Sequence, residues 1–98
     1  MPRSCDSICV FEWEWDEDNV EHLDRHGVSP EEAEEALRDP RAFSVPAHPS
    51  RREPRYALVG ATEARRVLFV VYTRRAGAVR VVTARDADPP HRRRYRRK

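Results

Sequence analysis

The sequence predicts one α+β domain in which two helices pack on one face of an antiparallel sheet of four to five strands. Its 98 residues can bury a single hydrophobic core. An alternating strand and two capped helices come first, and apolar strands separated by turns follow. Helices and strands segregated in this way along a chain are typical of α+β proteins. The longest apolar run, Val67–Tyr72, is far below the roughly 18 residues of a membrane-spanning helix, so we expect no contact with a membrane.

Residues 1–10 form an expected N-terminal tail, ahead of a single domain that covers residues 11–98. The tail lacks the apolar segment of roughly 7–15 residues that a secretory signal contains, so we expect a cytoplasmic protein. Its two cysteines, Cys5 and Cys9, have no Cys or His neighbours that would complete the usual four ligands of a zinc site. We interpret both cysteines as incidental.

Residues 11–15 alternate three aromatic residues with two glutamates, which is the period of a strand with one buried face. Asp16 or Asp18 can cap a helix that runs to His26. Gly27 then occupies the position after the helix end, where glycine is favoured. We therefore expect a strand followed directly by a short helix.

A second helix carries the clearest signals in the chain. Ser29 is a good N-cap, Pro30 suits the first helical turn, and Glu32 completes a capping box. The apolar positions within 33–37 share the face that we expect to be buried. Asp39 and the proline after it end the helix.

The rest of the chain consists of predicted strands separated by turns. The run Val67–Val71 is apolar on both faces, so we expect that strand to be central and covered on both sides. Three prolines mark residues 46–54 as a loop. The expected elements are strands at Ala42–Val45, Arg55–Thr62, Arg66–Arg74 and Ala78–Arg85, and a short helix at His91–Arg97.

Charge is divided unevenly along the chain, although the net charge is only +2. Residues 1–40 hold 13 acidic and 3 basic residues, a balance of −10, whereas residues 41–98 hold 4 acidic and 16 basic ones, a balance of +12. A basic half of this kind suits the phosphates of a nucleic acid or the acidic segment of a partner.

Two groups of residues can carry chemistry. His22 and His26 lie four residues apart on one helical face, as in zinc helices, but a third ligand is missing and a histidine pair at a helix end is the simpler interpretation. Arg80 interrupts an apolar strand and Arg85 ends it, which favours a phosphate-binding surface over a solvated sheet edge. Tyr56 lies among the arginines, where the alternatives are stacking on a base and packing on the face of its strand, the commoner role of a tyrosine in a strand.

The chain lacks the motifs of most cofactor-dependent enzymes. It has only three glycines and no Gly-rich phosphate loop. It also has no serine-centred nucleophile elbow. We therefore expect an activity that requires no cofactor.

Four blocks of the sequence resemble the BrnT family of toxins from type II toxin–antitoxin pairs. The blocks are, in order, WDEDNVEHLDRHGVSPEEAEEAL at Trp15–Leu37, RYALVGATE at Arg55–Glu63, LFVVYT at Leu68–Thr73 and VRVVTARDA at Val79–Ala87. The resemblance implies a compact RelE-like ribonuclease fold and a toxin that cuts RNA and slows growth. It also implies a ribbon-helix-helix antitoxin of the BrnA type, which silences the toxin in a 2:2 complex and binds operator DNA.

The resemblance also assigns site residues, position by position. The His-Gly signature falls on His26, the acidic position after the G-x-T turn on Glu63, and Arg25 stands where many relatives carry a lysine. His91 lies where relatives usually have a glutamate-rich closing helix. The expected catalytic residues are His26, Glu63, Arg80 and Arg85, the expected RNA- or phosphate-binding residues are Arg25, Arg55, Tyr56 and Tyr95, and no metal ligand is expected.

RNA can be cleaved without a metal when its own 2′-hydroxyl attacks the adjacent phosphate. The protein must then remove a proton, neutralise the charge of the phosphorane and protonate the leaving 5′-oxygen. We assign Arg80 and Arg85, with Arg55 beside them, to the phosphate, and His26 or Glu63 to proton transfer. The alternatives are a non-catalytic basic regulator that binds nucleic acid or a partner, and a metal-dependent nuclease built on the histidine pair.

Overall fold

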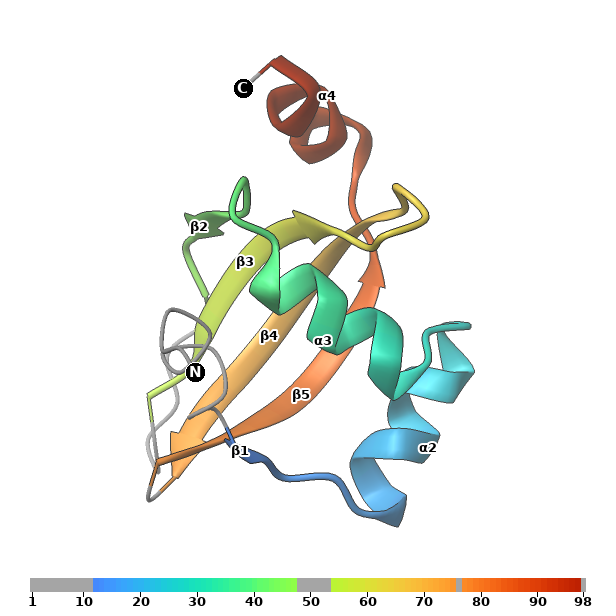
Figure 1. The fold of residues 1–98 in the computed structure, drawn as a ribbon, viewed down its shortest axis with the longest axis vertical. Helices are drawn as coiled ribbons and strands as arrows, with labels where there is room; N and C mark the ends of the chain where they lie inside the picture. Colours follow the sequence, from blue (N-terminus) through green and yellow to red (C-terminus); the bar gives the residue numbers. More distant parts are fainter. Residues whose placement is uncertain (1–11, 48–53, 76, 98) are drawn as a thin grey trace, which may run out of the picture.

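Five strands in one sheet and three helices make up the part of the chain that the computed structural model describes, residues 12–47, 54–75 and 77–97 (Figure 1). The strands are β1 (Glu12–Trp13), β2 (Phe43–Val45), β3 (Tyr56–Ala61), β4 (Val67–Arg75) and β5 (Ala78–Asp86). The helices are α2 (Glu17–Arg25), α3 (Pro30–Arg38) and α4 (Pro89–Arg97). The predicted α+β class is confirmed. The tail assigned to residues 1–10, with its cysteines, lies outside the described residues.

The strands follow the order β1-β5-β4-β3-β2, so the apolar strand β4 is central, as its sequence predicts. Neighbouring strands from β5 to β2 are antiparallel, whereas β1 runs parallel to β5, with Glu12 opposite Ala78. The sheet is therefore mixed. Tight turns fix the directions of β3, β4 and β5, but the long connection between β1 and β5 contains two helices and three strands and imposes no antiparallel direction. No helix of the described residues is long and apolar enough to cross a membrane.

Side chains of β4 alternate between two apolar clusters, one on each face of the sheet. Leu68 and Val70 belong to the cluster under α2 and α3, which we call the helix-side core. Its buried members are Leu23, Val28, Ala33, Ala36, Leu68, Val70, Val81 and Ala84. Val67 belongs to the opposite cluster, the α4-side core, against which Phe69 of the same strand and Tyr95 of α4 pack. Both faces of β4 are therefore covered, as predicted.

The first two helices begin where the sequence indicates. Asp16, rather than Asp18, caps α2 and accepts hydrogen bonds from backbone N–H groups two and three residues further on. Ser29 caps α3 and forms the predicted capping box with Glu32. Gly27 follows the end of α2 with a φ angle of +71°, in the left-handed region that glycine adopts without strain.

The strand expected over residues 11–15 is shorter in the structure, because β1 ends at Trp13. Trp15 has left the sheet, and its indole N–H donates to Glu34 Oε2 at 2.8 Å while its ring packs against the helix-side core. The capping role of Asp16 explains the difference, since the backbone must turn into the helix immediately after Trp15. The aromatic pattern indicated burial at this position, but helix α3 provides the partner.

Candidate functional site

The side chains predicted to act on RNA are divided between the two ends of the sheet. The β4–β5 hairpin closes one end, and α4 packs at the other (Figure 1). Arg55, Tyr56 and Arg80 lie at the hairpin end, whereas Glu63 and Arg85 lie at the α4 end. Arg80 and Arg85 are about 16 Å apart along β5, at roughly 3.3 Å per residue. At this distance, Arg80 and Arg85 cannot both lie next to the same phosphate group.

Arg80 is held by two carboxylates that precede α2. Its guanidinium lies 2.8 Å from Asp16 Oδ2 and 3.2 Å from Glu14 Oε2, and the side chain is 18% exposed. The hydrogen bond from Arg80 is the largest cause that lowers the pKa of Asp16. This pairing explains how an arginine is accommodated in an apolar strand, because its charge is compensated where it is partly buried.

Arg85 lies in a layered group of side chains at the α4 end. Its guanidinium stands 4.7 Å from the ring centre of Phe69, and that ring is stacked on His91 with centroids 6.0 Å apart and planes 3° from parallel. We call Arg85, Phe69 and His91 the Arg85 stack. Arg85 also pairs with Asp88 at 3.1 Å, but it is 41% exposed and is therefore more accessible than Arg80. Nδ1 of His91 is buried without a hydrogen-bond partner.

Glu63 and Tyr95 line one cavity of about 500 Å³ between the β3–β4 turn and α4, which we call the α4 pocket. The Tyr95 hydroxyl donates to Asp39 Oδ2 at 2.5 Å, and Asp39 also accepts from the backbone N–H groups of Ala61 and Arg41. Burial and then the bond to Asp39 raise the pKa of Tyr95. Burial alone would raise the pKa of Asp39, but these hydrogen bonds together lower it.

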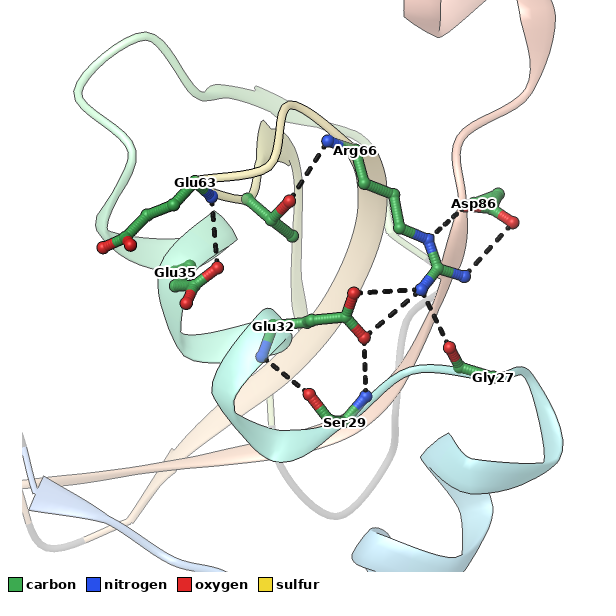
Figure 2. A network of polar contacts seen from close by, with 8 residues as sticks. Gly27, Ser29, Glu32, Glu35, Glu63, Arg66 and Asp86 are labelled. Atoms are coloured by element: carbon green, nitrogen blue, oxygen red, sulfur yellow. Dashed lines mark hydrogen bonds and ion pairs between the residues drawn. The ribbon is translucent and has the colours of Figure 1, made fainter.

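His26 is the exposed C-terminal cap residue of α2. Gly27, directly after it, contacts Arg66, which was not among the expected site residues (Figure 2). Arg66 donates to the carbonyl of Gly27 at 2.8 Å, to both oxygens of Glu32 at 3.2 Å, and to Asp86 at 2.7 Å. We call this set the Arg66 network. It joins the corner between α2 and α3 to the end of β5, so His26 and Arg85 are brought to the same end of the molecule.

The pKa values of the acidic partners reflect the Arg66 network. The hydrogen bond from Arg66 is the main cause that lowers the pKa of Asp86. The pKa of Glu32 is also lowered, first by the backbone N–H of Ser29 and then by Arg66 against the effect of burial. Both carboxylates are therefore ionised and paired with Arg66. The guanidinium of Arg66 is fixed by these contacts and serves the structure rather than the binding of a ligand.

The rings of the two histidines lie close together, and His22 also contacts a residue of β5. The rings of His22 and His26 lie 5.4 Å apart in an edge-to-face arrangement, and His22 Nε2 is 3.1 Å from the hydroxyl of Thr83. No group of three or more His, Cys, Asp or Glu side chains that could hold a metal ion occurs in residues 12–47, 54–75 and 77–97. Arg25, also on α2, is exposed and approaches Glu21 at 3.8 Å.

Tyr56 is the one exposed large hydrophobic side chain of the described residues, at 42% exposure. Its ring stacks on Tyr72 with centroids 5.5 Å apart, and the guanidinium of Arg74 lies 5.7 Å from its centre. Arg55, directly before it, is exposed as well. The hairpin end therefore carries a small aromatic and basic surface that is separate from the Arg85 stack.

The structure brings into the site residues that the sequence did not nominate for it. His91 completes the Arg85 stack, and Arg41, Arg65 and Arg96 line the α4 pocket with Glu63. The crowding of arginines at the C-terminus was visible in the sequence, but it could not indicate which of them share a cavity.

Comparison with known families identifies the chain. The family model described as "Ribonuclease toxin, BrnT, of type II toxin-antitoxin system" matches residues 15–91. Comparison with curated proteins gives no match. The matched range runs from the start of α2 to the first turn of α4 and includes the Arg85 stack and the Arg66 network. Since it spans well over half of the sequence, the chain belongs to the BrnT family of ribonuclease toxins of type II toxin–antitoxin systems.

Proposed function

We propose that this chain cleaves RNA endonucleolytically and without a metal ion, by attack of the RNA 2′-hydroxyl on the adjacent phosphate, and so inhibits growth and translation in the cytoplasm. The family match carries the ribonuclease activity. The Arg85 stack supports the position of the chemistry. It combines an accessible guanidinium, an aromatic ring and an imidazole from three different elements.

The roles follow from what the reaction needs. Arg85 would neutralise the phosphorane, because a guanidinium fork can donate two hydrogen bonds to phosphate oxygens. Proton transfer would fall to His91, or to His26 or Glu63 at the same end, since imidazole and carboxyl groups are common general acids and bases.

Arg80 takes a different role in this proposal from the one expected from the sequence. Its contacts with Asp16 and Glu14 support the start of α2 and leave little of the guanidinium for a phosphate. We therefore separate it from Arg85 and assign it to the stability of the fold. Arg55 and Tyr56 would hold a more distant part of the RNA at the hairpin end.

The test is cleavage of RNA by the purified chain in the presence of excess EDTA. We expect Arg85→Ala to lower the cleavage rate by about 10²–10³, the loss found when one charge-stabilising donor is removed. Arg93→Ala, which removes an exposed charge from α4, is the matched control and should cleave like the wild type. Full activity of Arg85→Ala would contradict the assignment. Loss of wild-type activity in EDTA would favour a metal-dependent nuclease, and no cleavage at all would favour a non-catalytic regulator.

We further propose that a ribbon-helix-helix antitoxin of the BrnA type neutralises the chain in a 2:2 complex and carries the complex to operator DNA. A type II system implies a protein antitoxin. Expression of the chain alone should arrest growth, and co-expression of the adjacent gene's product should restore it. The mass of the purified complex would give the stoichiometry. Growth without arrest in the absence of a partner would contradict the toxin assignment.

A further inference from the structure

The α4 pocket has the size and the lining of a site for an anion. Its volume of about 500 Å³ lies within the range of roughly 300–1,000 Å³ of small-molecule sites. Three chain segments form it: the β3–β4 turn, the residues after α3, and the last turn of α4. Its charged lining residues are Asp39, Arg41, Glu63, Arg65 and Arg96, with Tyr95 between them.

The α4 pocket is lined by three arginines and two carboxylates, so its charge is positive. Asp39 already accepts three hydrogen bonds, from Tyr95 and two backbone N–H groups. Within the described part of the chain, the guanidinium groups of Arg65 and Arg96 make no side-chain hydrogen bond or ion pair. Arg41 lies over the Tyr95 ring at 5.4 Å. Guanidinium groups gathered in this way favour phosphate, which they can bind bidentately.

Arg65 is held in a backbone conformation that an arginine rarely adopts. Its φ angle is 70°, and no other non-glycine residue in the described part of the chain has a positive φ. The turn is closed by backbone hydrogen bonds between Thr62 and Arg66 and between Arg65 and Thr62, both at 2.9 Å. Glycine would adopt this backbone conformation with less strain, so an arginine at this position lowers the local stability of the turn. Such strain concentrates at binding sites.

The α4 pocket and the Arg85 stack share α4 as a wall. Tyr95 lines the pocket and also packs against the α4-side core, as does Phe69, the ring beneath Arg85. An RNA strand on the stack would therefore pass the pocket with a neighbouring nucleotide. We propose that the α4 pocket binds a backbone phosphate of the RNA next to the scissile one, through Arg65 and Arg96. This inference rests on the proposed ribonuclease function.

The test measures binding separately from cleavage. The probe is a fluorescent 2′-O-methyl RNA tetramer, which has no free 2′-hydroxyl and cannot be cut by the proposed reaction. We expect the double variant Arg65→Gly with Arg96→Ala to bind it about tenfold more weakly. The dependence of affinity on salt should also become shallower, by about one released ion per lost phosphate contact. Fluorescence anisotropy at several salt concentrations measures both quantities.

The matched control is the double variant Arg93→Ala with Arg97→Ala, which removes the same charge from exposed positions of α4 that do not line the pocket. Its affinity should fall clearly less than that of the pocket variant, since a charge without a fixed contact to a phosphate contributes only a screened, long-range attraction. Equal losses in the two double variants, or wild-type affinity in the pocket variant, would overturn the proposal. The single variant Arg65→Gly should melt no lower than the wild type, and a clearly lower melting temperature would also overturn it.

Cleavage of ordinary RNA by the wild type is scored in parallel. Pocket-dependent binding without any cleavage would contradict the proposed function and leave the pocket assignment standing. If the wild type cleaves RNA but the pocket variant binds the probe as tightly as the wild type, the pocket assignment is wrong and the proposed function stands.

Discussion

Arg66 shows how one residue can tie together segments that are far apart in the chain. Its partners Gly27, Glu32 and Asp86 lie 39, 34 and 20 residues away. Nothing in the spacing of the sequence indicates these contacts, because the fold alone brings them together. The sequence could show that arginines are abundant, but it could not separate Arg66, which is structural, from Arg65, which is adjacent and faces a cavity.

Replacing Arg66 by alanine should destabilise the fold and change its response to acid. We expect the free energy of unfolding at neutral pH to fall by about 1–2 kcal/mol, a moderate value because Asp86 is exposed to solvent. The lowered pKa values of Asp86 and Glu32 mean that their contribution is complete above their ordinary values of 3.8 and 4.5 and is lost as pH falls through the lower folded values. Arg66→Ala should therefore lose less stability than the wild type between about pH 5 and pH 2.

Urea unfolding across this pH range measures both effects. Most of the change should come from Asp86, since Ser29 also stabilises the ionised form of Glu32. Arg93→Ala serves again as the control for loss of a surface charge. An identical acid profile in Arg66→Ala and the wild type would contradict the argument.

At the scale of elements, the sequence predicted helices and strands well where local chemistry decides the outcome. Caps, prolines and glycine at the helix ends are local signals, and the boundaries of α3 follow them. The strand at residues 11–15 was predicted too long, because the cap at Asp16 overrides the alternating pattern. The parallel direction of β1 depends on β5, which lies more than sixty residues later, and no local signal could predict it.

The capping box of α3 can be tested by removing one hydroxyl. Ser29→Ala leaves the backbone N–H of Glu32 without its partner, whereas the Glu32 carboxylate keeps its bond from the backbone N–H of residue 29. We expect the free energy of unfolding to fall by about 1 kcal/mol, the typical value for loss of an N-cap. Ser44→Ala, at an exposed position of β2, is the matched control and should change stability by less than about 0.5 kcal/mol. Equal urea midpoints for Ser29→Ala and the control would contradict the role of the cap.

At the scale of the whole molecule, the unequal charge of the two halves has a structural use. Glu14 and Asp16 compensate Arg80, and Glu32 compensates Arg66, so part of the acidic half neutralises arginines of the later strands. The positive charge that is left is concentrated on α4, with Arg92, Arg93, Arg94, Arg96 and Arg97. The charge pattern therefore predicted a basic surface, but only the fold shows which basic residues are already paired.

The candidate site was predictable in part for the same reason. The resemblance in sequence indicated Arg85, Glu63 and His26, and the structure brings all three to the α4 end. It could not separate Arg80 from Arg85, because both stand in one strand and differ only in their partners from other elements. The contribution of His91 likewise depends on how α4 folds back onto β4.

The pairing of β1 with β5 also bears on how the chain is made. A ribosome releases the N-terminal end first, so β1 emerges while its neighbour in the sheet has not yet been synthesised. The sheet can close only after β5 is complete, and α4, with its part of the proposed RNA site, emerges later still. A nascent chain therefore lacks the assembled sheet until β5 has left the ribosome, and the proposed RNA site is complete only once α4 has followed.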